Sequence, residues 1–192
     1  MEIIKPNKKA LNKAVKVIKK GGVVISPTDT VYGILADATN KKAVEKIFKI
    51  KKRSRQKTLP VFVKDIKMAK QIAEIDKKQE KILKKYWPGK YTFILNSKLK
   101  TQNSKLLTKN GTIALRVPKY KFLNDLLKKI NRPLAQTSVN ISGEPPMTKI
   151  SDIKEFIRRT GFRMLIVDGG DSRNSKPSKI IDLTSKRLTR LR

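Results

Sequence analysis

Four short segments of this chain combine hydroxyl groups, amide groups and cations in patterns that suit the binding of anions. They are SPTDTVYG at 26–33, KKRSRQK at 51–57, TIALRVP at 112–118 and QTSVNISGEPP at 136–146. Lys and Arg bind phosphates and carboxylates through charge-assisted hydrogen bonds, and donors near a turn add to such a site. The chain contains neither His nor Cys. This excludes a Ser-His-Asp triad, a thiol nucleophile, a disulfide and a zinc site built from imidazole or thiolate.

The first two segments each have a purely structural interpretation as well. Residues 26–33 follow an apolar run, and ligands tend to bind at the ends of strands in α/β sheets. Pro27 and Asp29 can equally fix an ordinary turn from which Tyr32 packs inward. The cations at 51–57 can form a solvated helix end, because 47 of the 192 residues are basic and such clusters arise by chance.

The other two segments leave a similar choice open. The run at 136–146 passes from an extended stretch into a loop, where Asn140 and Gly143 suit either anion binding or a plain turn. Arg116 lies within an apolar strand pattern, where a guanidinium is costly to bury unless it is paired or binds an anion. It therefore predicts either an anion site or an ion pair with a residue such as Asp29 or Asp182.

The elements that must position these segments alternate between strand-like and helix-like patterns. Apolar runs predict strands at 23–25, 59–63, 91–95, 112–117, 134–138, 164–167 and 180–183. Helical spacing predicts helices after Asn7, around 43–48, between 66 and 83, at 121–130 and from Asp152 to about Thr160. Asp152 and Glu155 resemble a capping box at the start of the last helix. The pattern predicts one α/β domain over residues 1–192 with a mixed sheet.

The chain carries a large charge for its size. Its 192 residues include 47 Lys or Arg and 15 Asp or Glu, so the net charge is +32. Such a charge predicts salt-dependent attraction to polyanions, because each neutralised phosphate releases counterions. A composition bias toward lysine is the alternative, since 36 of the cations are Lys and 11 are Arg. No apolar run suits a membrane span or a secretion signal, so we expect a cytoplasmic protein that does not enter a membrane.

Taken in order, these segments and two more resemble the YrdC/TsaC family of L-threonylcarbamoyl-AMP synthases. The matching motifs lie between Ser26 and Leu183: PTDTVYGILAD, the K-x-R of KKRSRQKTLPVFV, WPGKYTFIL, TIALRVP, TSVNISGEPP and DGGDSRNSKPSKIIDL. The resemblance implies a YrdC-like, twisted and open mixed sheet with helices on its outer face. It also implies a positively charged central cleft and the short, single-domain form of the family.

The same resemblance implies a nucleotidyltransferase reaction that needs neither His nor Cys. L-threonine, bicarbonate and ATP give threonylcarbamoyl-AMP, pyrophosphate and water, with Mg²⁺ carried by the ATP and no metal site of the protein's own. The product serves the threonylcarbamoyl modification of the adenosine next to the anticodon in tRNAs that read codons beginning with A. The resemblance thus implies further partners, namely tRNA or other RNA and a downstream threonylcarbamoyl-transferase complex.

The site residues implied by the resemblance are carried over position by position. The family's catalytic tetrad around the phosphates and the carbamate corresponds to Lys51, Arg53, Ser138 and Asn140. Residues that would border ATP, besides this tetrad, are Lys57, Thr112, Pro146, Arg190 and Arg192, of which one late arginine would reach the nucleotide. Residues that would line the threonine site are Thr30, Tyr32, Arg116, Gln136 and Ser178, with Arg116 pairing with the threonine carboxylate.

A different class of function would use the same basic cleft without turnover. In that alternative the protein is an RNA-binding or ribosome-maturation module, whose affinity falls steeply with salt. Such a module needs cations, but it does not need hydroxyl and amide groups in this order. The sequence therefore favours the enzyme.

Overall fold

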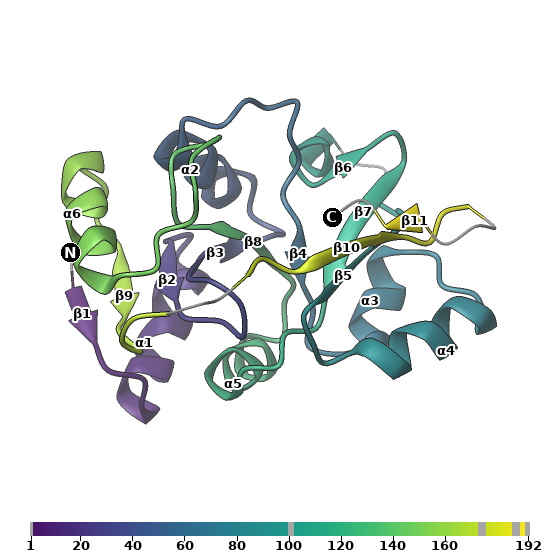
Figure 1. The fold of residues 1–192 in the computed structure, drawn as a ribbon, viewed down its shortest axis with the longest axis horizontal. Coiled ribbons are helices and arrows are strands. Elements are labelled where there is room, and N and C mark those ends of the chain that lie inside the picture. The colour runs from purple at the N-terminus through teal and green to yellow at the C-terminus, as the bar shows by residue number, and fades with distance from the viewer. Residues whose placement is uncertain (1, 100–101, 173–175, 186–188, 191–192) are drawn as a thin grey trace.

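The structure is a computed structural model that describes residues 2–99, 102–172, 176–185 and 189–190. Its strands are β1 (Glu2–Ile4), β2 (Val24–Ser26), β3 (Gly33–Asp37), β4 (Val61–Phe62), β5 (Tyr91–Asn96), β6 (Thr108–Lys109), β7 (Thr112–Arg116), β8 (Leu134–Ser138), β9 (Leu165–Val167), β10 (Lys179–Asp182) and β11 (Thr189–Arg190). They form one sheet in the order β1-β9-β2-β3-β8-β4-β7-β5-β10-β11, with β6 paired to β7. Parallel and antiparallel pairs both occur, so the predicted open, mixed sheet is confirmed (Figure 1).

Helices cover both faces of this sheet. The described helices are α1 (Lys8–Lys19), α2 (Lys41–Lys51), α3 (Ile66–Ile72), α4 (Lys77–Tyr86), α5 (Lys121–Ile130) and α6 (Ile150–Thr160). Helices α1 and α5 lie side by side and share an apolar cluster with Val24 and Leu35. The other four helices share a larger cluster with Ile25 and Ile34, on the opposite face. Neighbouring strand residues thus serve opposite faces, as the period of two in a strand requires.

Helix α5 shows how closely the sequence pattern can set an element. Its buried residues recur at helical spacing along one face, and both of its ends match the predicted range 121–130. The chain leaves the helix at Asn131, which takes the left-handed conformation with φ of 53°. Asn tolerates this conformation better than most residues. The apolar face and the C-cap residue Asn131 are both local signals, so the bounds of this helix can be predicted from the sequence alone.

The predicted helical region between 66 and 83 is two helices rather than one. Ala73 leaves helix α3 and pairs as a β-bridge with Ser97. Helix α4 then begins at a capping box, in which Asp76 accepts from the Gln79 N–H at 2.7 Å and the Gln79 side chain accepts from the Asp76 N–H at 2.9 Å. The helical spacing of apolar residues continues across the gap between the two helices, so the cap at Asp76 was not recognised from the sequence.

The capping box predicted at Asp152 and Glu155 is wrong. Helix α6 begins at Ile150, so Asp152 lies inside its first turn. The Ile150 N–H instead donates to the Asp171 carboxylate at 3.0 Å, from a loop that is distant in sequence. Because this cap comes from tertiary structure, local spacing could not identify it.

Strand β3 was not predicted, yet it joins two of the anion-binding segments. It pairs antiparallel with β2 and with β8, in a register that sets Gly33 opposite Ser138. The loop before β3 and the loop after β8 therefore lie side by side, at the same end of these two strands.

Within the described residues, no helix is long and apolar enough to cross a lipid bilayer.

Candidate active site

A cavity of about 440 Å³ opens over the sheet where strands β5, β7, β8 and β10 lie close together. In β5 and β7 alternate residues line it, namely Thr92 and Ile94 in β5 and Ala114 and Arg116 in β7, as the period of two in a strand requires. Predicted site residues that line it are Thr30, Arg53, Arg116, Gln136, Ser138, Asn140, Pro146 and Ser178. The structure thus brings together residues from all four of the anion-binding segments named above and from the loop before β10.

Arg116 is buried in the wall of this cavity and has an internal partner. Its side chain is 2 % exposed. One terminal nitrogen donates to the Asp29 carboxylate at 2.5 Å and the other to the Thr30 hydroxyl at 3.2 Å, while Nε donates to the Gly89 carbonyl at 2.9 Å. These bonds use three of the five guanidinium N–H groups. The ion pair with Asp29 is therefore present, and Arg116 still faces the cavity.

The loop that carries Asp29 and Thr30 is held in shape by its own side chains. The Thr28 hydroxyl accepts from the Thr30 N–H at 2.9 Å and donates to the Val31 carbonyl at 2.8 Å. Asp29 accepts a second bond from the Lys119 N–H at 3.1 Å. A rigid loop of this kind fixes the guanidinium plane of Arg116 before any ligand arrives.

Lys51 is a second buried cation, and its surroundings differ. It lies in the last turn of α2 and is 1 % exposed. Its ammonium group donates to the Ser138 carbonyl at 2.6 Å, the Asn140 carbonyl at 2.9 Å and the Asn140 side-chain oxygen at 2.7 Å. Burial, helped by the nearby charge of Arg53, lowers the pKa of Lys51 to about 7. All three N–H groups are engaged, and Lys51 does not line the cavity.

Asn140 links this ammonium group to the cavity. Its side-chain oxygen also accepts from the Ser138 hydroxyl at 2.7 Å, and its amide nitrogen donates to the carbonyls of Ile141 and Glu144. Asn140 therefore holds the loop after β8 from within. Ser138 and Asn140 line the cavity, and Lys51 lies behind them, away from the cavity.

Arg53 shapes the turn that follows α2. Its side chain donates to the carbonyls of Lys57 and Thr58 at 2.8 and 2.7 Å, and it lines the cavity. Burial lowers the pKa of its guanidinium. The Lys57 side chain is exposed and does not line the cavity, so only the backbone of Lys57 takes part in this turn.

Tyr32 and Thr112 bond to backbone groups outside the lining of this cavity. Tyr32 is fully buried, and its hydroxyl accepts from the Gly169 N–H at 3.0 Å and donates to the Gly170 carbonyl at 2.6 Å. Burial raises the pKa of this hydroxyl to about 12. Thr112 donates to the Lys109 carbonyl. Neither side chain lines the cavity, and both assignments stay predictions.

The two late arginines cannot be placed beside the cavity. Arg190 lies in β11, opposite Ile181 of β10, and its side chain is outside the described residues. Arg192 also lies outside the described part of the chain. The assignment of one of them to the nucleotide stays a prediction.

Other residues of the cavity wall were missed by the sequence reasoning. They are Thr58, Thr92, Thr137, Glu144 and Pro177, among others. The Thr92 and Ser178 hydroxyls lie 2.9 Å apart and join β5 to the loop before β10. Thr92 is a polar residue between two aromatic residues of a predicted strand, and this pattern could have identified it as a residue of the cavity wall.

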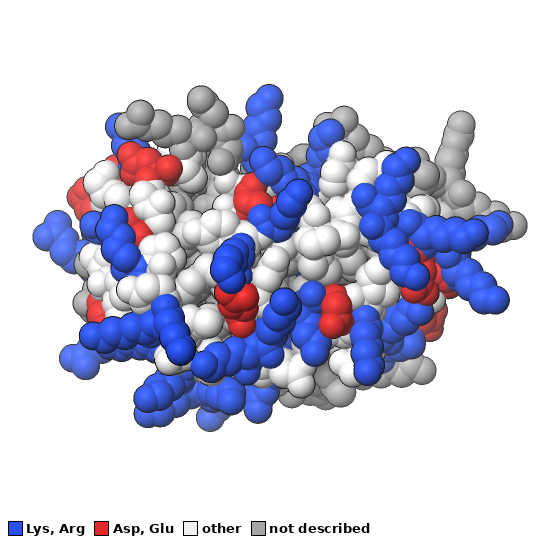
Figure 2. All heavy atoms as spheres, turned by 90° about the horizontal axis from the view of Figure 1, so that it is seen from below, with Lys and Arg blue, Asp and Glu red and all other residues white. Residues whose placement is uncertain are grey.

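The charge of the cavity is mixed. Arg53 and Arg116 line it, but so does Glu144, and Asp29 neutralises Arg116. The positive cleft therefore stays a prediction. Figure 2 shows Lys and Arg side chains spread over the side of the molecule that carries α1, α5 and α4. Among the described residues, no group of three acidic side chains could hold a metal ion.

Comparisons with known proteins show the family and the fold of this chain. The sequence model of the Sua5_yciO_yrdC family, described as "Telomere recombination", matches residues 16–192. A threonylcarbamoyl-AMP synthase of Pyrococcus abyssi is 34% identical over 87% of this chain, which spans 48% of that relative. The crystal structure of P. abyssi Sua5 complexed with L-threonine matches with a TM-score of 0.87 at 29% identity, over 100% of this chain and 56% of that one. The crystal structure of Escherichia coli YciO matches with a TM-score of 0.87 at 26% identity, over 100% of this chain and 93% of that one.

Proposed function

The chain belongs to the Sua5/YciO/YrdC family, and from this membership and its cavity we propose that it is a threonylcarbamoyl-AMP synthase. It would form threonylcarbamoyl-AMP, pyrophosphate and water from L-threonine, bicarbonate and ATP. Support comes from the P. abyssi relatives, one named for this activity and one complexed with L-threonine. The product would serve the modification of tRNA adenosines next to the anticodon, through a downstream transferase complex.

The position of Arg116 is the main structural support for this proposal. A guanidinium that is 2 % exposed, fixed by Asp29 and Thr30, and open to a cavity suits a carboxylate ligand. The two N–H groups that its internal bonds leave over can donate to the two oxygens of the threonine carboxylate. The Thr30 hydroxyl lies beside them, and Gln136 and Ser178 line the same cavity.

The nucleotide would lie toward Arg53, Ser138, Asn140 and Pro146. The threonine amine and bicarbonate form a carbamate with loss of water, and a carbamate oxygen then attacks the α-phosphorus of ATP. A new P–O bond forms while the bond to pyrophosphate breaks. Because both reactants are anionic, alignment and charge compensation are the main tasks of the protein. Arg53 would supply the charge, while Ser138 and Asn140, whose side-chain donors are engaged within the loop, would fix the shape of the wall beside the phosphates.

Lys51 would act as a positioning residue. Its ammonium group holds both oxygens of Asn140 and the Ser138 carbonyl, so it sets the shape of the wall that faces the phosphates. ATP would enter as its Mg²⁺ complex, with the metal bound mainly by the triphosphate.

The E. coli YciO match leaves a second function to test. The name YciO states no activity, and this chain covers 93% of that protein. The net charge of +32 favours binding of RNA as the alternative role. RNA binding without turnover would then replace the synthase reaction.

Release of pyrophosphate from ATP tests the proposal, measured with and without L-threonine and bicarbonate. The synthase requires release that depends on both, and that falls at least about 100-fold in Arg53→Ala because charge compensation is lost. RNA binding with no threonine-dependent release would instead establish the alternative.

A further inference from the structure

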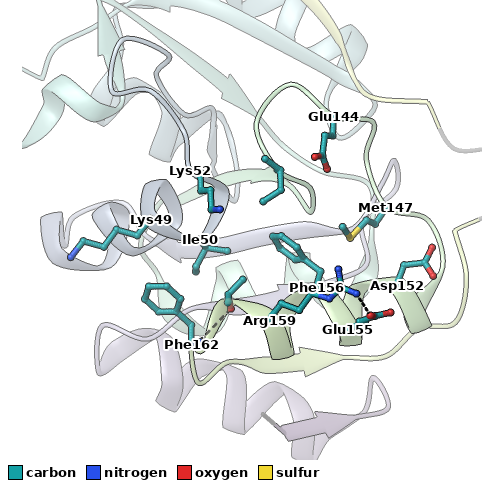
Figure 3. A pocket seen from close by; sticks show the side chains of 12 residues that line it. Lys49, Ile50, Lys52, Glu144, Met147, Asp152, Glu155, Phe156, Arg159 and Phe162 are labelled. Atoms are coloured by element: carbon teal, nitrogen blue, oxygen red, sulfur yellow. Dashed lines mark hydrogen bonds and ion pairs between the residues drawn. The ribbon is translucent and has the colours of Figure 1, made fainter.

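A second hollow, of about 540 Å³, lies on the other side of the loop that follows β8 (Figure 3). It is bounded by the end of α2, by this loop and by α6. Its apolar floor consists of Ile50, Ile141, Met147, Phe156 and Phe162. Ile141, Met147 and Phe162 are only partly buried. A concave, apolar surface of this volume is in the range that binds ligands.

The charges around this floor are arranged with opposite signs on opposite sides. Lys49 and Lys52 lie on the α2 side, and Glu144 and Asp152 lie on the side of the loop and the start of α6 (Figure 3). Within the described part of the chain, none of these four side chains forms an ion pair. By contrast, Arg159 and Glu155 at the same rim pair with each other.

We propose that this hollow docks a peptide segment of a partner protein, with apolar side chains between an acidic end at Lys49 and Lys52 and a basic end at Glu144 and Asp152. The inference does not depend on the proposed reaction. A polyanion would be repelled by the two carboxylates. An uncharged ligand would leave the two lysines and the two carboxylates without partners of opposite charge.

The docked peptide would rest on the back of the wall that carries Asn140. Ile141 and Met147 face the hollow, while Asn140 faces the cavity and Glu144 lines both. The loop is tied to its base by bonds from the Met147 N–H to Val139 and from the Ser142 N–H to Lys51. The partner would thus contact the same loop that forms part of the candidate active site.

Fluorescence anisotropy with labelled pentapeptides tests the proposal on the full chain. The peptides, with both termini blocked so that only side chains are charged, are Glu-Leu-Phe-Leu-Lys, the di-acidic Glu-Leu-Phe-Leu-Glu and the di-basic Lys-Leu-Phe-Leu-Lys. We expect the peptide with opposite ends to bind about tenfold more tightly than the other two. Non-specific attraction to a chain of charge +32 would instead favour the di-acidic peptide, and that order would overturn the proposal.

Charge-reversal variants identify the hollow as the binding site. Lys49→Glu with Lys52→Glu is expected to shift the preference to the di-basic peptide, and Asp152→Lys to shift it toward the di-acidic one. Lys41→Glu with Lys42→Glu is the matched control, because both lysines are exposed at the other end of α2. An equal effect of the two double variants, with all chains shown to fold by circular dichroism, would refute the site. Self-association that only Lys49→Glu with Lys52→Glu abolishes would assign the hollow to a second copy and also refute it.

Discussion

Two buried cations, Arg116 in β7 and Lys51 at the end of α2, are stabilised in different ways. Arg116 is paired with a buried carboxylate and keeps two N–H groups beyond its internal bonds. Lys51 has three neutral oxygen partners and no N–H group left, and burial lowers its pKa to about 7. A buried cation can therefore either present donors to a ligand or hold a loop in place.

This contrast separates binding from positioning. The charge of Arg116 is compensated before any ligand arrives, so a bound carboxylate adds to a site that is already stable. Lys51 has no ion pair with a described residue and is compensated mainly by neutral oxygens, with a smaller contribution from the charge of Glu144, so its protonation is sensitive to pH. Substitutions at the two places should have distinguishable effects on stability, turnover and pH dependence.

Arg116→Ala should have the largest effect. It leaves the Asp29 carboxylate buried without its partner, which typically costs about 3–5 kcal/mol of the free energy of unfolding. Urea unfolding measures this loss, and threonine-dependent pyrophosphate release should fall at least about 100-fold. Arg159→Ala is the control, because that exposed pair with Glu155 should contribute about 0–1 kcal/mol. Normal threonine affinity in Arg116→Ala would remove Arg116 from the threonine site.

Lys51→Met should have the next largest effect. It removes the donor shared by Ser138 and Asn140, which should lower the free energy of unfolding by about 1–3 kcal/mol. Turnover should fall while the KM for threonine stays near its original value, because Lys51 does not line the cavity. Lys46→Met on the same helix is the control, since Lys46 makes one bond to the Gly21 carbonyl. A raised KM for threonine with unchanged turnover would contradict the positioning role.

The same pair of proteins tests the pH dependence. The folded protein loses the Lys51 proton near pH 7, whereas the unfolded chain keeps it up to the ordinary pKa of 10.5. The unfolded state binds more protons in this interval, so stability from this group rises with pH between about 7 and 10.5. Urea unfolding at several pH values should show the wild type gaining stability relative to Lys51→Met. Parallel curves for the two proteins would mean that Lys51 keeps its proton when folded.

Tyr32→Phe should affect stability more than binding. It removes the two hydrogen bonds to Gly169 and Gly170, which should cost about 1–2 kcal/mol of the free energy of unfolding. Threonine affinity, measured by calorimetry, should change by less than about twofold because Tyr32 does not line the cavity. The opposite result, lost affinity at full stability, would restore the contact that the family resemblance implies.

Lys57→Ala should have the smallest effect. Its side chain is exposed, and Arg53 binds its carbonyl rather than its ammonium group. The free energy of unfolding should change by less than about 0.5 kcal/mol. The KM for ATP should also change little, and a tenfold increase would show that Lys57 borders the nucleotide after all.

The sequence predicted the elements whose signals are local. Strand β8 and helix α5 have the predicted bounds. In α5 the helical spacing of apolar residues repeats over enough residues to exclude other structures. Strand β3 was missed since GILAD reads as part of a motif rather than as a strand, and the start of α6 was missed because its cap comes from Asp171.

The sequence by itself determined which functional groups this protein can use and which segments contain them. The absence of His and Cys, the four hydroxyl-rich and basic segments and the family resemblance can all be read without coordinates. Only the tertiary structure decided how each group is used. Arg116 could be an ion pair or an anion site from sequence, and it proves to pair with Asp29 while facing a cavity. Lys51 and Tyr32 turn inward to backbone groups, because long-range strand and loop pairing sets which polar atoms lie within reach.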